Sequence, residues 1–175
     1  MRALALLLPL VVLAGCVGPP VVTPVPTPTA TPVFASDEEA LAAAEEAYAA
    51  YLKLADQVFA EGGVNPERLA SVATGEQLAA DVAGFDEARR EGLRGTGTTE
   101  FSELVLQQFD PRTDVNMVVV YLCEDVSGTD VIDANGVSTV TPDRPNMVTY
   151  QVSFDLDRPS ESLLVADKEV WAQSC

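Results

Sequence analysis

Apolar residues between Ser36 and Gly63 recur at steps of three and four, which is the spacing of one face of a helix. A capping box, Ser36-Asp37-Glu38-Glu39, precedes this run, and Gly62-Gly63 ends it. We therefore predict a long helix at the start of the folded part of the chain. Its buried face would be Leu41, Ala44, Tyr48, Tyr51, Leu52, Ala55, Val58 and Phe59.

Two shorter helices are predicted next. Asn65-Pro66 begins one over about residues 66–73, because proline is favoured at the first helical position. Another spans about residues 75–91 and ends at Gly92 or Gly95. Its apolar face would be Leu78, Val82, Phe85 and Ala88.

After Gly97 the apolar period changes to two, which is the period of a strand with one buried face. We predict four strands, over residues 99–109, 115–126, 147–156 and 162–173. Turn sequences separate them: Asp110-Pro111, Asp133-Ala134-Asn135-Gly136 and Arg158-Pro159. Short connections join antiparallel neighbours, so the pattern predicts an α+β domain with three helices packed on one face of a curved antiparallel sheet.

The first sixteen residues have the pattern of an export signal. Arg2 is followed by an apolar run from Ala3 to Leu13, and this run of about eleven residues is too short to span a bilayer. It ends in Leu13-Ala14-Gly15-Cys16, which resembles the lipobox of bacterial lipoproteins. The resemblance implies cleavage after residue 15, diacylglyceryl transfer to the Cys16 thiol and acylation of its amine, for example with palmitate. A plain secretory signal is the alternative.

Residues 16–35 are predicted to be a lipidated cysteine followed by a tether. Six prolines alternate with valine and threonine, and no residue of this stretch is charged. Such a segment favours the extended polyproline conformation, with a reach of roughly 60 Å. Threonines beside the prolines leave an O-glycosylated stalk open as an alternative to a bare linker. Residues 36–175 would then form a single globular domain.

Charge and composition exclude several functions. The chain has 27 acidic and 10 basic residues, a formal net charge of −17 and no histidine. Nucleic acid is excluded as a partner, because phosphate-backbone binding depends on lysine and arginine. Catalytic pairs that need an imidazole are excluded as well. Repulsion from anionic lipid gives a physical reason for a long tether.

The order and length of the predicted elements resemble the nuclear-transport-factor-2-like family, including the stretches 118–123 and 165–171. That resemblance implies a cone-like fold, and a cystatin-like fold is the alternative. Enzymes of the family are isomerases, dehydratases and cyclases that use a carboxylate, often with a tyrosine, inside the cone. The tyrosines of this chain occupy apolar-face positions and are expected to be core residues: Tyr48, Tyr51, Tyr121 and Tyr150.

Lipidation of Cys16 would leave two cysteines, Cys123 and Cys175, and an exported chain most simply joins them in a disulfide. Two free thiols, or an intermolecular bridge through Cys175, are the alternatives. A cluster of Asp125, Asp130, Asp133 and Asn135 lacks the glutamate that completes a calcium loop, so a hairpin turn is the simpler interpretation. No metal or cofactor is expected.

Together these features predict a cell-envelope lipoprotein, held at the outer face of the membrane by lipid on Cys16, with a non-catalytic domain. An envelope protein or a small apolar ligand is the expected partner, and the domain is expected to be a monomer or weak dimer. A carrier of small apolar ligands is the alternative function. A carboxylate–tyrosine enzyme is a further alternative.

Overall fold

The computed structural model describes residues 33–175, so Cys16, the predicted signal peptide and most of the predicted tether lie outside the described residues. The α+β architecture is confirmed. Its elements, in chain order, are α1 (Asp37–Ala60), the short 3₁₀-helix η1 (Pro66–Ser71), α2 (Gly75–Glu91), β1 (Arg94–Thr96), β2 (Glu100–Phe109), β3 (Val118–Asp125), β4 (Asp130–Ile132), β5 (Met147–Asp157) and β6 (Ser162–Ala172). Among these elements, none is a helix both long and apolar enough to cross a membrane.

Local capping explains where the helices begin and end. The Ser36 hydroxyl accepts a hydrogen bond from the Glu39 amide at 3.3 Å, as a capping box requires. The Glu39 carboxylate accepts the amide of Ala35, whereas the capping box predicts the amide of Ser36. Gly92 ends α2 in the left-handed conformation, with φ of 71°. The second predicted helix is the 3₁₀-helix η1, which ends two residues before the predicted end; Asn65 before it is left-handed, and its side chain makes no capping hydrogen bond.

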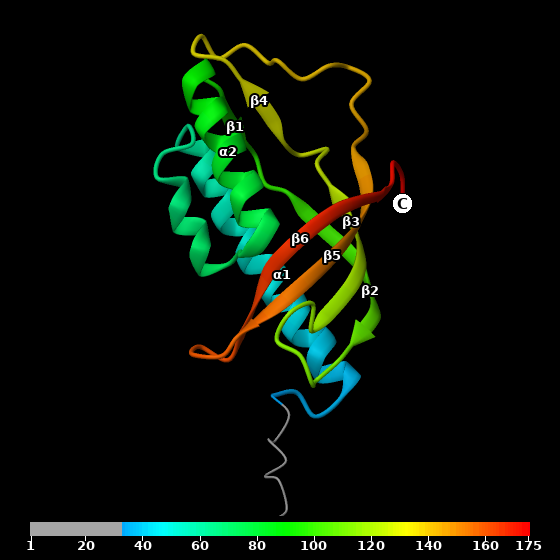
Figure 1. The fold of residues 1–175 in the computed structure, drawn as a ribbon. Helices are drawn as coiled ribbons and strands as arrows, with labels where there is room; N and C mark the ends of the chain where they lie inside the picture. Colours follow the sequence, from blue (N-terminus) through cyan, green and yellow to red (C-terminus); the bar gives the residue numbers. More distant parts are fainter. Residues whose placement is uncertain (1–32) are drawn as a thin grey trace, which may run out of the picture. The chain divides into compact units, whose positions relative to one another are not determined.

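Four long antiparallel strands form one sheet in the order β2-β3-β5-β6 (Figure 1). They match the four predicted strands to within three residues at each end. A separate two-stranded ribbon pairs β1 with β4, and the sequence pattern did not predict it. The predicted turn at Asp133 is present, since the Gly136 amide donates to the Asp133 carbonyl at 3.0 Å.

The two faces of the four-stranded sheet differ in what covers them. The inner face, which bears Val118, Val120 and Leu122 of β3, packs against the helices, and all three side chains are buried. The register places Val119, Tyr121 and Cys123 on the opposite, outer face. Helix α1 runs behind β5 and β6 in Figure 1 and contacts β2, β3 and β6.

Helix α1 supplies most of the helical side of the core. Ala44 and Tyr48 are fully buried, and the Tyr48 ring packs edge-on against Phe101 and Phe154. Val33 and Phe34 also pack against this core, with Phe34 and Phe109 ring centroids 6.2 Å apart. The packed domain therefore extends to Val33, three residues before the predicted boundary at Ser36, because both apolar side chains are partly buried against the core.

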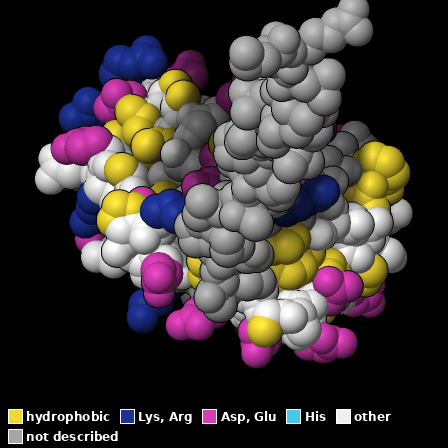
Figure 2. Space-filling model, turned by 60° about the horizontal axis from the view of Figure 1, so that its bottom comes forward, with side chains coloured by type: hydrophobic (Ala, Val, Ile, Leu, Met, Phe, Trp, Pro, Cys, Tyr) yellow, Lys and Arg dark blue, Asp and Glu magenta, His cyan; other side chains and the backbone are white. Residues whose placement is uncertain are grey.

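Acidic residues occur only after Ala35, so the folded domain carries the whole negative charge of the chain. Figure 2 shows acidic and basic side chains interspersed among hydrophobic ones on one face of the described domain.

Gly63 gives a direct test of the packing between α1 and α2. Its φ is 72°, and a Cβ there would lie 2.2 Å from the Phe85 carbonyl oxygen. Gly63→Ala should lower the free energy of unfolding by about 1–3 kcal/mol. The matched control is Gly84→Ala in the interior of α2, where a Cβ meets nothing within 4 Å; it should raise stability by about 0.5–1 kcal/mol. Urea unfolding measures both, and equal effects would contradict the close approach.

Candidate functional site

A chain of polar side chains crosses the interface between the helices and the inner face of the sheet. Alternation along β3 turns Glu124 inward after Val118, Val120 and Leu122. Opposite it lie two tyrosines of α1, two polar residues of α2 and one lysine of β6. We call this set the inner polar network: Tyr48, Tyr51, Gln77, Asp81, Glu124 and Lys168.

Glu124 is the most buried charge of the inner polar network, with 4% of its surface exposed. Its Oε1 accepts hydrogen bonds from the Tyr48 hydroxyl and from Lys168 Nζ, the latter at 2.9 Å. Lys168 Nζ also lies 4.3 Å from the centroid of the Tyr150 ring. The buried carboxylate is thus compensated by a cation that is itself held by an aromatic face.

The second half of the inner polar network joins α1 to α2. Gln77 Nε2 donates to the Tyr51 hydroxyl oxygen and to Asp81 Oδ1, both at 2.8 Å, and the Tyr51 hydroxyl donates to Asp81 Oδ1 at 3.2 Å. Gln77 is the one buried residue of α2. The other carboxylate oxygen, Asp81 Oδ2, is buried and has no hydrogen-bond partner among residues 33–175.

Burial sets the protonation of this network. It raises the pKa of Tyr48 and of Tyr51 well above the ordinary value, and the nearby carboxylates Glu124 and Asp81 raise them further. Both tyrosines are therefore neutral hydrogen-bond donors near neutral pH. Burial also raises the pKa of Asp81, although hydrogen bonds from Tyr51 and Gln77 oppose the effect.

The network unites carboxylates with tyrosines, the pair of residue types that the family resemblance implies for an enzyme. Here, however, the Tyr48 hydroxyl is bound to Glu124 and the Tyr51 hydroxyl to Asp81. These hydrogen bonds between members of the network tie α1 to both α2 and the sheet. The third expected core tyrosine, Tyr150, is half-buried beside Lys168, whereas Tyr121 lies on the outer face.

Sequence reasoning missed Gln77, Asp81, Glu124 and Lys168. A signal for three of them, Glu124, Gln77 and Asp81, was present in the pattern. Glu124 continues the inward alternation of β3, and Gln77 and Asp81 are spaced by four on the buried side of α2. Their pairing could not be found in this way, because Glu124 and Lys168 are 44 residues apart in the sequence.

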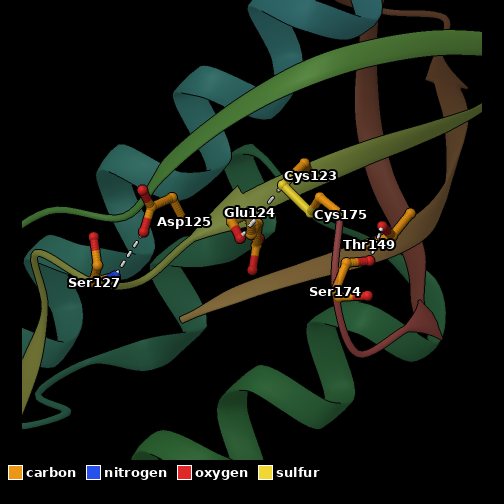
Figure 3. The surroundings of a disulfide bond; sticks show 7 residues. All are labelled: Cys123, Glu124, Asp125, Ser127, Thr149, Ser174 and Cys175. Carbon is orange, nitrogen blue, oxygen red and sulfur yellow. Dashed lines mark hydrogen bonds between the residues drawn. A yellow bond between two sulfur atoms is a disulfide. The ribbon is translucent and has the colours of Figure 1, made fainter. Parts of the chain in front are cut away.

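The predicted disulfide between Cys123 and Cys175 is present, with Cα atoms 5.9 Å apart (Figure 3). Because Cys123 lies on the outer face of β3, the bond draws residues 173–175 across that face from the end of β6. The Thr149 hydroxyl donates to the Ser174 carbonyl at 2.9 Å and fixes the same segment to β5. The end of the chain is therefore held at two points.

The acidic cluster considered for calcium is not drawn together. Asp125 accepts the Ser127 amide, Asp130 accepts the Ser138 hydroxyl, and Asp133 accepts the amides of its own turn. Each carboxylate thus stabilises a local turn. Within residues 33–175, no group of three or more acidic or cysteine side chains has a geometry that could hold a metal ion.

Beside the disulfide, the outer face of the sheet bears an aromatic pair. The register aligns Val105, Tyr121, Gln151 and Glu169 in one row across the four strands. Trp171 lies at a register shift in the β5–β6 pairing, where it has no partner on β5. The centroid of its ring lies 4.8 Å from that of Tyr121. We call these five residues the outer patch. Trp171 is 62% exposed and Val105 is 53% exposed.

Two open grooves lie elsewhere on the surface of the domain. One, of about 430 Å³, lies between α1 and the start of β2 and includes Leu52, Asp56 and Phe101. The other, of about 360 Å³, lies between α1 and the β5–β6 turn and includes Phe34, Val72 and Leu163. Neither of these two grooves includes a member of the inner polar network, whereas a smaller one of about 250 Å³ beside α2 includes Asp81.

Comparison with known proteins places the fold but no function. No family model and no curated protein matches the sequence.

Among solved structures, the intermembrane-space region of the chloroplast protein ARC6 aligns with a TM-score of 0.54 and 16% identity, covering 75% of this chain and 96% of that one. Two structures from Catenulispora acidiphila also align. One, in complex with S-DNPA, has a TM-score of 0.49 at 16% identity, covering 77% of this chain and 93% of that chain. The other has a TM-score of 0.47 at 14% identity, covering 76% and 94%. At 16% identity, the likeness to the ARC6 region shows a shared fold alone.

The ion pair inside the network can be tested by removing its cation. Lys168→Met leaves the Glu124 carboxylate buried without a counter-charge and should lower the free energy of unfolding by about 3 kcal/mol. The double variant Glu124→Gln/Lys168→Met removes both charges and should recover much of that loss. Urea unfolding at neutral pH measures both. A single variant as stable as the wild type would show that the pair does not hold the interface.

Asp81 should give folding a distinct pH dependence. Its pKa is raised in the folded chain, so between that raised value and the ordinary 3.8 the folded state binds a proton that the unfolded state has lost. Relative to Asp81→Asn, the wild type should gain stability as pH falls through this window and level off below it. Asp86→Asn, on the exposed side of the same helix, is the control. A wild-type advantage that shrinks on acidification would contradict the assignment.

Proposed function

We propose that this chain is a membrane-anchored lipoprotein of the cell envelope whose domain binds a partner and does not catalyse a reaction. The observation that carries the proposal is the use of the three cysteines. Two of them, Cys123 and Cys175, form the disulfide, a bond typical of an oxidising compartment. The third, Cys16, follows Leu13-Ala14-Gly15 at the end of an apolar run and would receive the lipid.

The organisation of the chain supports an anchored and extended location. Two acyl chains on Cys16 would give a stable attachment to the membrane, whereas one chain attaches only reversibly. The proline-rich stretch would then carry the acidic domain away from anionic headgroups at the outer face of the cell membrane. Localisation, anchoring and signal cleavage all follow from this one interpretation of Cys16.

The contents of the helix–sheet interface support a binding role over a catalytic one. Its tyrosines and carboxylates are paired with one another, and burial keeps both tyrosines neutral. The outer face, by contrast, presents Trp171 and Val105 to solvent. Exposed aromatic and aliphatic groups beside polar ones are typical of surfaces that bind partners.

Within this proposal, the domain is a variant of the nuclear-transport-factor-2-like cone. Register irregularities in the β2–β3 and β5–β6 pairings support a bent sheet, because such bulges increase strand bending and twist. The placement of α1 and α2 on the same side as the inward residues of β3 is consistent with that fold.

A second candidate, a carrier of small apolar ligands, is favoured by the groove between α1 and β2. Leu52 and Phe101 give it apolar walls, and the Asp56 carboxylate accepts both the amide and the hydroxyl of Thr99 at its edge. Native protein extracted from its own membrane would carry a bound apolar molecule, detectable by mass spectrometry, if this candidate were correct.

Lipid anchoring has a direct test in Cys16→Ser. Wild-type protein should sediment with the membrane fraction, and its N-terminal peptide should carry the mass of a diacylglyceryl group. The variant should lose that mass and leave the membrane fraction. Cys175→Ser, which removes a cysteine at the other end of the chain, should still be lipidated and is the control. A Cys16→Ser protein that stays in the membrane at the wild-type level would contradict the proposal.

A further inference from the structure

We propose that the outer patch, Val105, Tyr121, Gln151, Glu169 and Trp171, docks a basic polypeptide segment of a partner protein, with an arginine or lysine of the partner over Trp171. This inference rests on the proposed partner-binding function and names the surface and the chemistry of the partner. The alignment, the rigidity and the charge of the patch support this inference.

The alignment comes from the strand register. Val105 of β2 pairs with Tyr121 of β3, Tyr121 with Gln151 of β5, and Gln151 with Glu169 of β6. One row across the sheet therefore runs from an apolar end at Val105 to an acidic end at Glu169. A partner segment lying along this row would meet an aliphatic contact, an aromatic contact, an amide and a carboxylate in turn.

The aromatic part of the patch is held in place before any partner binds. The rings of Tyr121 and Trp171 lie 4.8 Å apart with an interplanar angle of 33°, so each restricts the other. Residues 173–175, directly after β6, are fixed by the Cys123–Cys175 disulfide and by the Thr149–Ser174 hydrogen bond. An exposed aromatic that is already ordered loses little conformational freedom on binding, which favours affinity.

The negative charge of the four-stranded sheet favours a basic partner. The four strands of the sheet contain eight acidic residues and a single basic one, Lys168. Lys168 is turned inward to Glu124, with 18% of its side chain exposed. At the outward positions of β5 and β6 lie Asp155, Asp167 and Glu169, the last two opposite Ser153 and Gln151. Within these four strands, no basic side chain offsets the outward acids.

These charges decide between the possible occupants. A second copy of this chain would bring acidic strands against acidic strands, which opposes self-association. A glycan could stack on Trp171 but would leave the outward carboxylates without a counter-charge. A guanidinium or ammonium group over the Trp171 ring would gain a cation–π contact, and Glu169, two residues earlier on β6, supplies a carboxylate for an ion pair.

The test measures binding of fluorescently labelled eight-residue peptides by anisotropy, with the full chain purified in detergent. One peptide alternates arginine and valine, and its control alternates glutamine and valine. The arginine peptide should bind and the glutamine peptide should not. Trp171→Ala should weaken binding of the arginine peptide about fivefold or more, as expected from the loss of a cation–π contact.

A matched pair of charge variants separates docking from general attraction to an acidic protein. Glu169→Gln lies in the outer patch, and Glu91→Gln lies at the exposed end of α2, so both remove one surface charge. Glu169→Gln should weaken binding about threefold, in the range expected for an exposed ion pair, and Glu91→Gln should not. Since Glu169 is exposed, this pair keeps the test valid even if Trp171→Ala folds poorly.

Two results would overturn the proposal. In the first, Glu169→Gln and Glu91→Gln have the same effect, which would mean attraction by net charge alone. In the second, a cell-wall glycan hexasaccharide binds and depends on Trp171 while the arginine peptide does not. Failure of lipid anchoring would leave both peptide results unchanged, so the docking surface and the anchor are tested separately.

Discussion

Packing of α1 across the inner face of the sheet is the contact on which the rest of this domain depends. Tyr48 stands at its centre, fully buried, with its ring against Phe101 and Phe154 and its hydroxyl on Glu124. That contact buries the apolar side chains on the inner face of the sheet. The described helices lie on this side of the sheet. The side chains at the alternate, outward positions of the strands therefore face solvent.

Burial of Glu124 has consequences for both faces. A carboxylate at an inward position requires a compensating cation, and Lys168 reaches it from β6. The single basic residue of the four strands thus points inward. The acidic side chains at the outward positions have no basic side chain of the same sheet to offset their charge. The interior ion pair and the acidic character of the outer patch are thus two results of the same residue placement.

Local signals predicted the elements well, because caps and periodicity act over a few residues. The bounds of α2 and the start of β5 are as the sequence indicated, and the disulfide followed from having two cysteines besides Cys16. The β1–β4 ribbon was missed because its three-residue strands carry no periodic signal of their own. Likewise, the network around Glu124 and the Tyr121–Trp171 pair join residues far apart in sequence, which meet only once the register is set.

Solvent quenching of Trp171 fluorescence tests the central claim, that one face of the sheet is filled by α1 and the other stays open. Trp171 is the single tryptophan of the chain, so the signal comes from the outer patch alone. In the purified folded protein, we expect emission typical of a water-exposed indole and an acrylamide quenching constant close to that of the urea-unfolded chain. Blue-shifted emission with a quenching constant several times lower would contradict the account, because it would mean that the outer face is covered.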